Sequence, residues 1–298
     1  MLTVVIPATD APATLGRCLA ALERSSQAHG LEVVSDPREG GPAAARNAGV
    51  ARGGGDIVVF VDADVAVHPD ALARLREALE RDGGLDAVFG AYDEHPAMAT
   101  TVSRFRNLLH HHVHTSSPGP ATTFWAGLGA VRREAFEAVG GFDARRYPRP
   151  SIEDIELGMR LHAAGRRIAL DPRVRGTHLK RWTLNSMLRT DLGARGAPWV
   201  ALRLERGGDG GGALNLSWRH RLAAGAAVLA VAGVVCGRPR VAALALAAMI
   251  APHARFYALL ARLGGLRLVL AGVPLSLLHH LTAAASVPAG LALWVHRR

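Results

Sequence analysis

The chain has 298 residues, of which 49% are hydrophobic, and 35 basic against 25 acidic residues give a net charge of +10. This length suits one medium domain with additions, or two small domains. Its two cysteines, Cys18 and Cys236, imply neither a disulfide framework nor a metal-binding spacing. Lys180 is the only lysine, so the basic charge is almost all arginine. No nucleic-acid motif accompanies this charge, and we expect no nucleic-acid partner.

The first part of the chain alternates two kinds of pattern. Short, β-branched apolar runs, typical of buried strands, cover residues 2–6, 31–34, 56–61 and 87–92. Helical patterns lie between them, over residues 13–28, 42–51 and 68–80. The opening MLTVVIPATD lacks the basic start and long apolar core of a signal peptide, so we interpret it as the first strand. This alternation indicates βαβ units and predicts an α/β fold with a mostly parallel sheet and helices on both faces.

Further elements are expected after this alternation. Helices are predicted over residues 103–114, 132–139 and 152–164, and strands over 122–131 and 168–170. The first of these helices carries the run HHHVH, in which His110 and His114 share one face. Such a pair suits a metal, but no third ligand stands nearby in the sequence. A position near a binding cleft or a membrane surface is therefore favoured for this run.

The composition changes at about Leu222, after which Ala, Leu, Val and Gly dominate. Three apolar stretches follow, at 222–237, 241–251 and 268–295. The last stretch is long enough to cross a hydrocarbon core of about 30 Å. We predict two domains, 1–215 and 216–298, the second being an α-helical membrane region with two to three spans. Buried helices of a soluble protein are the alternative, but arginines at nearly every break favour lipid headgroups.

One predicted loop between the apolar stretches carries Arg255, Arg262 and Arg267. Cytoplasmic loops of membrane proteins carry an excess of Lys and Arg, so this loop is expected in the cytoplasm. The chain is therefore expected in the cell membrane as a multi-pass protein, with residues 1–215 facing the cytoplasm and membrane lipid as a partner.

Asp62 and Asp64 stand directly after the predicted strand DIVVFV. In α/β sheets ligands bind beyond the carboxyl ends of the strands, and two carboxylates so placed can share a hard cation such as Mg²⁺ or Mn²⁺. A metal there can bridge the phosphates of a nucleoside diphosphate and neutralise the charge that builds up as the diphosphate leaves. The alternative interpretation is a polar turn that caps the next helix.

Glu153 and Asp154 follow Ser151 at the start of the predicted helix 152–164. A carboxylate aimed into a cleft from a helix N-terminus can take the proton from an attacking hydroxyl as a general base. Acidic residues in a first helical turn also complement the helix dipole, so capping alone is the alternative.

Four motifs then occur in a specific order. They are VVIPA at 4–8, GGPAAARNAGVARGGGDIVVFVDADV at 40–65, FWAGLGAVRREAFEAVGGFD at 124–143 and EDIELGMRLHAAGRRIALDP at 153–172. In these motifs the chain resembles family 2 glycosyltransferases with the GT-A fold, which is Rossmann-like, over about residues 1–182. The most similar type is the bacterial one with C-terminal membrane segments, which the last third of this chain matches in character.

The resemblance implies an inverting, metal-dependent transfer of a sugar from a nucleotide-diphosphate sugar to a hydroxyl, with Mn²⁺ or Mg²⁺ as cofactor. The membrane segments favour a lipid or polyprenyl-linked acceptor. By matching positions, Asp62 and Asp64 form the D-x-D metal motif, Asp154 is the catalytic base and Glu153 is its neighbour. His178 falls where many members place a histidine on the metal or the diphosphate, a role that imidazole can take. A core or surface histidine is the alternative.

The same resemblance assigns further substrate-binding residues. They are Pro7, Asp36, Arg46, Asp62, Gly127, Gly129, Arg181 and Trp182. Gly127 and Gly129 would let the backbone approach the sugar closely. Arg181 and Trp182 resemble an R-W pair that processive members place near the acceptor, although the rest of that motif is absent.

The chain departs from the family between its first helix and GGPAAARN. Members usually have there a second strand ending in D-D-x-S, an acidic turn that helps hold the base and ribose. Here residues 28–34 run directly into Ser35-Asp36-Pro37, so a strand and its acidic turn are missing, and Asp10 and Asp36 are the available substitutes. The alternative function is a non-catalytic, membrane-bound relative that has lost part of the nucleotide pocket.

A nucleotidyltransferase acting on a sugar phosphate is a third interpretation, because it shares the βαβ core and an acidic metal site. It would need a Gly-rich N-terminal loop with a basic residue for the triphosphate. Residues 7–10, Pro-Ala-Thr-Asp, do not supply one.

Overall fold

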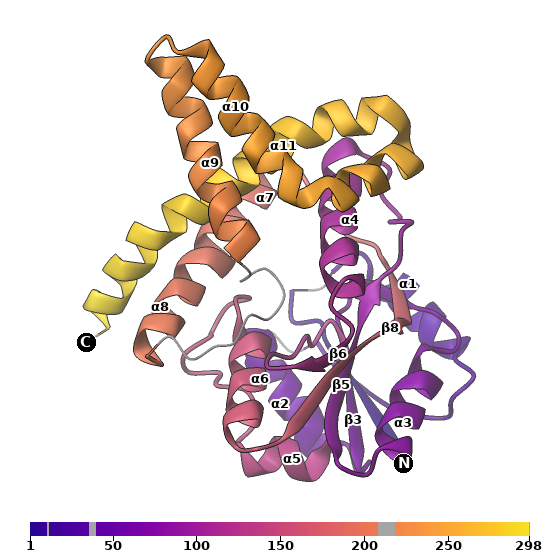
Figure 1. Cartoon of the computed structure of the whole chain (residues 1–298). Helices are drawn as coiled ribbons and strands as arrows, with labels where there is room; N and C mark the ends of the chain where they lie inside the picture. Colours follow the sequence, from indigo (N-terminus) through magenta and orange to yellow (C-terminus); the bar gives the residue numbers. More distant parts are fainter. Residues whose placement is uncertain (11, 36–39, 208–217, 298) are drawn as a thin grey trace. The chain divides into compact units, whose positions relative to one another are not determined.

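The computed structural model of the protein describes residues 1–10, 12–35, 40–207 and 218–297 (Figure 1). These residues divide into two compact units, which we call the sheet unit and the helical unit. The sheet unit comprises Met1–Met98 and His114–Lys180, and the helical unit comprises Ala99–Val113 and Arg181–Arg298. The predicted start of the membrane region at residue 216 lies within the helical unit and stays a prediction.

The sheet unit is built on one eight-stranded sheet. Its strands are β1 (Leu2–Pro7), β2 (Gly30–Val34), β3 (Ile57–Val61), β4 (Val65–Val67), β5 (Leu85–Tyr92), β6 (Gly119–Ala121), β7 (Leu128–Arg132) and β8 (Arg167–His178). The order is β2-β1-β3-β7-β5-β8-β4, and β6 pairs with β8 off this path. β1 is parallel to β2 and β3, and β5 is parallel to β8, whereas the pairs made by β4, β6 and β7 are antiparallel. The predicted α/β class is confirmed.

Three parallel strands bring their carboxyl ends to one edge of the sheet. β1 and β3 are buried along almost their whole length, which is why both are continuous apolar runs in the sequence. Pro7 pairs with Val34, and Val5 pairs with Phe60, so the chain leaves β1, β2 and β3 at the same edge. Asp62 is the first residue after β3, and this edge therefore carries the predicted site.

Between the first two helices, the described residues form one strand, β2, which is the outer strand of the sheet. The expectation that a strand is missing here is therefore wrong, because β2 pairs parallel with β1. Asp36, one of the two proposed substitutes for the missing acidic turn, lies outside the described residues. Asp10 is exposed in the turn after β1.

The helices of the sheet unit are α1 (Leu15–Glu23), α2 (Pro42–Arg52), α3 (Ala71–Arg81), α5 (Arg133–Ala138) and α6 (Glu153–Ala163). α2 begins with Pro42, whose fixed φ suits a first helical turn, where its missing N–H is not needed. Gly49 of α2 lies directly on β1, because a Cβ there would come within 2.3 Å of a Val5 methyl carbon. This close packing fixes α2, and with it Arg46, next to the sheet.

The structure changes three of the predicted elements. β8 is twelve residues long, whereas the sequence analysis predicted a strand over residues 168–170 alone. The second half of β8 was missed since it alternates buried and exposed positions and forms no apolar run. The strand predicted from residue 122 begins at Leu128, since residues 122–127 form a loop. The helix predicted over 13–28 ends at Glu23.

The helical unit contains most of α4 (Thr101–Thr115) and all the elements after Lys180. These are α7 (Leu184–Arg189), η2 (Thr190–Gly196), α8 (Ala197–Glu205), α9 (Trp218–Val235), α10 (Pro239–Ile250), η4 (Ala251–His253) and α11 (Ala254–His296). α11 contains a break at Gly265, whose φ of 61° lies in the left-handed region that glycine adopts without strain. The loop predicted around Arg255, Arg262 and Arg267 is wrong, because all three lie within α11.

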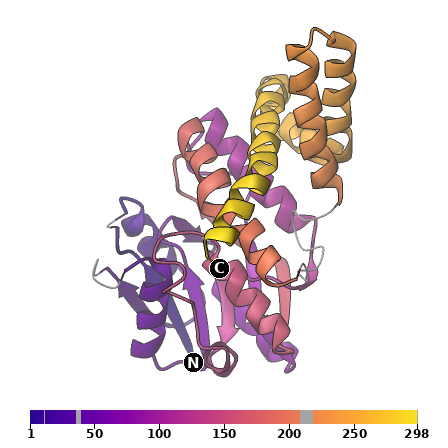
Figure 2. The same ribbon diagram turned by 90° about the vertical axis from the view of Figure 1, so that its left-hand side faces the viewer.

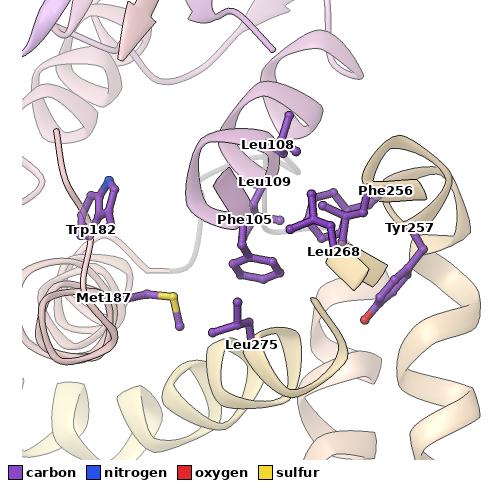
Figure 3. Close-up of a cluster of buried hydrophobic side chains, with 10 residues drawn as sticks. Phe105, Leu108, Leu109, Trp182, Met187, Phe256, Tyr257, Leu268 and Leu275 are labelled. Carbon is purple, nitrogen blue, oxygen red and sulfur yellow. The ribbon is translucent and has the colours of Figure 1, made fainter. Parts of the chain in front are cut away.

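A compact apolar cluster joins α4, the segment after Lys180 and α11 (Figure 3). Its buried members are Phe105, Leu108, Leu109, Trp182, Met187, Phe256, Tyr257, Leu260, Leu268 and Leu275. Phe105 of α4 points toward Leu275 of α11 (Figure 3). Burial of these side chains, at about 25 cal/mol per Å² of apolar area, explains why the helix at 101–115 belongs mainly to this unit.

α9 and α10 lie side by side as a hairpin, drawn in orange in Figures 1 and 2. Gly233 permits this approach, since a Cβ there would come within 2.7 Å of the Ala242 nitrogen. Among the described residues, one helical stretch, Pro239–His296, is long and apolar enough to cross a membrane. The predicted count of two to three spans stays a prediction.

Candidate active site

Asp62 and Asp64 lie in the short turn between β3 and β4. The turn is fixed by the backbone: Asp62 N–H donates to the Gly127 carbonyl at 3.1 Å, and Val65 N–H donates to the Asp62 carbonyl at 2.9 Å. The thiol of Cys18, from α1, lies 3.6 Å from the same Asp62 carbonyl oxygen. The backbone that carries both carboxylates is therefore held by hydrogen bonds to the Gly127 loop and to α1.

Asp64 faces His178, the last residue of β8. Val65 pairs with His178 in the antiparallel β4–β8 ladder, and Leu179 N–H donates to the Asp64 carbonyl at 2.8 Å. This register brings the His178 Nε2 to 3.6 Å from the Asp64 Oδ2. Burial favours the protonated form of Asp64, but His178 and the charge of Lys180 outweigh it and hold the pKa of this carboxyl below its usual range.

Asp62 instead pairs with Arg46 of α2. The Arg46 Nη2 donates to the Asp62 Oδ1 at 2.6 Å, and its Nη1 donates to the Glu153 Oε1 at 3.0 Å. The Arg46 side chain is 5% exposed. Burial opposes its charge, but Asp62 and Glu153 raise the pKa of the guanidinium above its usual value, so this buried arginine is charged. One guanidinium thus links the aspartate motif to the start of α6.

Glu153 is enclosed, whereas its neighbour Asp154 is partly exposed. The second carboxylate oxygen of Glu153 accepts the Ser151 N–H at 2.8 Å, so both of its oxygens have partners. Asp154 accepts the Ala126 N–H at 3.2 Å on Oδ2 and the Ile155 N–H at 2.8 Å on Oδ1. Of the two acidic residues, Asp154 is the one with access to a ligand.

The loop at 122–127 makes hydrogen bonds to both acidic segments, the Asp62–Asp64 turn and the start of α6. Ala126 donates to Asp154, and Gly127 accepts from Asp62. Gly158 of α6 lies against this loop, because a Cβ there would come within 2.1 Å of the Phe124 nitrogen. Asp62, Asp64 and Asp154 therefore lie around one edge of the sheet, as their predicted shared role requires.

The predicted metal ligands are brought together in part. Among the residues that the structure describes, no group of three or more His, Cys, Asp and Glu side chains is placed to hold a metal ion. Asp64 and His178 form a pair whose carboxylate oxygen and imidazole nitrogen suit Mn²⁺. Asp62 is bonded to Arg46. Asp64 and His178 therefore suit two ligand positions of such a metal, and the role of Asp62 as a third ligand stays a prediction.

The other predicted site residues have diverse surroundings. Gly127 and Gly129 have a packing role, since Cβ atoms there would come within 2.4 Å of the Trp125 ring and 2.5 Å of the Trp125 carbonyl oxygen. Pro7 ends β1 at the site edge. Arg181 and Trp182 belong to the helical unit, where Arg181 is exposed and the Trp182 ring lies in the apolar cluster. Their predicted roles in substrate binding stay predictions.

The sequence reasoning missed two aromatic residues beside the site. The Tyr92 ring stacks on the His178 imidazole, with ring centroids 4.2 Å apart and planes 14° apart. The Trp125 ring packs edge-on against Tyr92 at 4.9 Å. Tyr92 is the last residue of a predicted strand, and the rule that ligands lie beyond strand ends could have found it.

An α/β sheet with aspartates at a strand end and an acidic helix start beside them is the arrangement expected of the GT-A fold. Glycosyl transferase family 2 is the family whose model matches this chain, over residues 21–140. Residues 21–140 therefore belong to glycosyl transferase family 2, and the family predicted from the sequence motifs is confirmed.

Similar proteins support this assignment. The pre-mycofactocin glycosyltransferases of two Mycobacterium tuberculosis strains are each 28% identical over 209 residues, which cover 64% of this chain. This chain spans 38% of the length of these curated relatives. The mannosyltransferase PcManGT from Pyrobaculum calidifontis, solved in complex with GDP-Man and Mn²⁺, has a TM-score of 0.54 at 17% identity. That likeness covers 100% of this chain and 87% of the other, and it shows a shared fold.

Proposed function

We propose that the chain is an inverting glycosyltransferase that moves a sugar from a nucleotide-diphosphate sugar to a hydroxyl acceptor. The observation that carries the proposal is the bridge made by Arg46, which bonds Asp62 at 2.6 Å and Glu153 at 3.0 Å. This bridge joins the aspartate turn and the start of α6 at one edge of the sheet. The family match over residues 21–140 supports the same reaction class.

In this proposal each acidic segment has its own task. Asp154 takes the proton from the attacking hydroxyl, since it is the partly exposed carboxylate and can act as a general base. Its bonds to the Ala126 and Ile155 amides fix its direction. Glu153 and Arg46 hold the helix start in place. In an inverting transfer the hydroxyl oxygen bonds to the anomeric carbon while the bond from that carbon to the diphosphate oxygen breaks.

Asp64 and His178 would hold a divalent metal, Mn²⁺ or Mg²⁺, with Asp62 beside them. When bound, the metal would neutralise the negative charge on the leaving diphosphate. Two observations support this assignment: the 3.6 Å separation of the Asp64 and His178 side chains, and the lowered pKa of Asp64, which keeps that carboxyl ionised. The related mannosyltransferase of the same fold was solved with Mn²⁺.

A lipid or polyprenyl-linked acceptor and a multi-pass membrane location complete the proposal, with the sheet unit in the cytoplasm. Val234, Val235 and Leu244 on the α9–α10 hairpin are at least 70% exposed, which suits a lipid environment better than water. Trp218 and Arg219 begin α9, and Arg238 and Arg240 stand at the opposite end of the hairpin. Tryptophan is enriched at membrane interfaces, which suits Trp218 at the start of α9.

Turnover of donor tests the catalytic part of the proposal. The full-length chain in detergent, with Mn²⁺ and a panel of nucleotide sugars, is expected to release nucleoside diphosphate. Asp154→Asn should lower the rate about 10²- to 10⁴-fold, the usual contribution of a general base. Glu137→Gln, an exposed carboxylate on α5, is the control and should retain the rate. Equal rates for wild type and Asp154→Asn would reject the assignment of Asp154.

A second candidate function is a non-catalytic, membrane-bound relative. The sequence favours it, because Ser35-Asp36-Pro37 stands where family members are expected to carry the acidic turn D-D-x-S. Calorimetry with nucleoside diphosphates and Mn²⁺ separates the two functions. Metal-dependent binding that is lost in Asp64→Ala supports the enzyme, whereas the absence of binding throughout the panel supports the inert relative.

The native cysteines test the membrane topology. Cys236 is exposed at the tip of the α9–α10 hairpin, and Cys18 is buried in α1. If the hairpin crosses the membrane and the sheet unit is cytoplasmic, a membrane-impermeant maleimide should label Cys236 from outside the cell. Labelling of Cys236 only in inverted vesicles would contradict this topology.

A further inference from the structure

We propose that Tyr92 is a positioning residue that fixes the plane of the His178 imidazole and so directs its Nε2 toward Asp64. This inference rests on the proposed metal site. It concerns a residue that lies outside the four family motifs.

The geometry of the stack carries the inference. The two rings are almost parallel, with planes 14° apart and centroids 4.2 Å apart. Both side chains are buried, Tyr92 at 8% exposed and His178 at 4%. Rotation of the imidazole about its bond to Cβ would break this face-to-face contact, so the stack favours the ring plane in which Nε2 lies 3.6 Å from the Asp64 Oδ2.

The strand register explains why the two rings meet. Tyr92 pairs with Gly176 in the parallel β5–β8 ladder. Side chains two residues apart on a strand point to the same face, so His178 shares a face with Gly176 and Tyr92. Diagonal neighbours of this kind are within reach of aromatic side chains. On its other side, His178 is the ladder partner of Val65, which follows Asp64.

Tyr92 is itself held in place by a second aromatic pair. The Trp125 ring packs edge-on against it, with centroids 4.9 Å apart and planes 83° apart. Trp125 in turn packs edge-on against His114 at 5.2 Å, and the His114 Nδ1 lies 2.9 Å from the Gly90 carbonyl oxygen. The Tyr92 ring is therefore supported by Trp125 and His114, and His114 contacts the backbone of β5.

Partners that orient a metal-ligating histidine typically change metal affinity by about 10- to 100-fold when they are removed. A merely structural tyrosine would change stability and leave the affinity unaltered. The two roles are therefore separable by measuring Mn²⁺ binding directly, without reference to turnover.

The test uses the full-length chain in detergent and the free-Mn²⁺ electron paramagnetic resonance signal as the readout. Tyr92→Leu is expected to weaken Mn²⁺ binding about tenfold, while Tyr92→Phe, which keeps the ring, should bind as wild type does. Phe105→Leu removes a buried aromatic ring from the helical unit and is the control. Thermal melts monitor folding, and Tyr92→Met replaces Tyr92→Leu if that variant does not fold.

A double-mutant cycle completes the test. In a His178→Ala background the change at Tyr92 should have no further effect, because the group that it orients is gone. If Tyr92→Leu binds Mn²⁺ as tightly as wild type while His178→Ala binds weakly, the role of Tyr92 is overturned and the metal site stands. If neither His178→Ala nor Asp64→Ala weakens binding, the metal site itself fails, and the inference about Tyr92 fails with it.

Discussion

The guanidinium of Arg46 donates a 2.6 Å hydrogen bond to the carboxylate of Asp62. Its other terminal nitrogen bonds Glu153, so a single buried cation bridges two carboxylates that come from segments far apart in the sequence. Removal of one partner from a buried ion pair is costly because the other charge is left without compensation.

Arg46→Met is therefore expected to destabilise the sheet unit by about 3 kcal/mol. Arg46→Lys should lose less stability, since lysine keeps the positive charge, although it cannot reproduce the geometry with which the two guanidinium nitrogens bond Asp62 and Glu153. Thermal or urea unfolding of the detergent-solubilised chain measures the loss. Arg17→Met is the control, because Arg17 is exposed on α1. Equal losses in the Arg46→Met and Arg17→Met variants would show that the bridge contributes nothing.

Gly158 is expected to be intolerant of a methyl group despite its place in a helix. In an open helical position, replacing Gly by Ala stabilises by up to about 1 kcal/mol. A Cβ at residue 158 would come within 2.1 Å of the Phe124 nitrogen and 2.4 Å of the Thr123 carbonyl carbon, both backbone atoms that cannot rotate away. Gly158→Ala should therefore destabilise by about 2 kcal/mol.

The matched control for that change is Gly16→Ala in α1, where a Cβ would meet nothing within 4 Å. Unfolding midpoints compare the two variants. The displacement of α6 in Gly158→Ala should also weaken the bond between Ala126 and Asp154 and lower turnover. A Gly158→Ala variant as stable as Gly16→Ala would contradict the close packing of α6 on this loop.

Asp191 in the helical unit is expected to contribute to the free energy of unfolding in a way that is lost in acid. Its carboxylate lies 2.8 Å from the Arg106 guanidinium and 2.9 Å from the His279 Nδ1. Burial opposes ionisation, but Arg106 and His279 outweigh it and lower the pKa of Asp191 to about 2. Because the folded pKa lies below the unfolded value of about 3.9, the stabilisation is complete above about pH 5 and is lost as the pH falls toward 2.

Chemical unfolding of wild type and Asp191→Asn between pH 2 and pH 6 measures this contribution. The difference in free energy of unfolding should shrink by about 2 kcal/mol from the upper to the lower end of that range. A difference that does not vary with pH would mean that the carboxylate has the same pKa in the folded and unfolded chain.

The two cysteines should differ sharply in reactivity. Cys18 is 0% exposed, and burial, together with the charges of Asp62 and Asp64, raises the pKa of its thiol to about 12. Only the thiolate reacts readily with maleimides. One equivalent of maleimide should therefore label the native chain in detergent, and two should label the unfolded chain. Cys236→Ser should abolish native labelling, and residual labelling of that variant would contradict the burial of Cys18.

The parts of the fold that depend on local patterns were predictable from the sequence. The apolar runs that became β1, β3 and β5 are buried on both faces, and such strands are recognisable without knowledge of their partners. The length of β8 was missed because the apolar run ends at Leu170, whereas the strand continues through Asp171 and Pro172 and is held by pairing with β5, β4 and β6.

The candidate site likewise has residues that local patterns predict and contacts that depend on distant segments. The strand-end rule and the motif order predicted Asp62, Asp64 and Asp154, whose roles stay predictions. The stacking of Tyr92 on His178 and the bridge from Arg46 to Glu153 depend on how distant segments meet, with 107 residues separating Arg46 from Glu153. Helix and strand periodicity carry no information on such contacts. The packing of Gly127 under the Trp125 ring was likewise invisible, and a close approach to substrate was inferred for it instead.

Polar contacts made by the residues next to His178 and Tyr92 fix the alignment of β8 at this site. Thr177 and Asp93, the neighbours of His178 and Tyr92, hydrogen-bond to each other, and Asp93 also lies 2.9 Å from the His68 Nε2. A slip of one residue in β8 would turn His178 away from Asp64 and present Thr177 in its place. These polar contacts fix the alignment of β8, and an insertion or deletion within Gly176–His178 is expected to disrupt the proposed metal site even if Asp64 and His178 were retained.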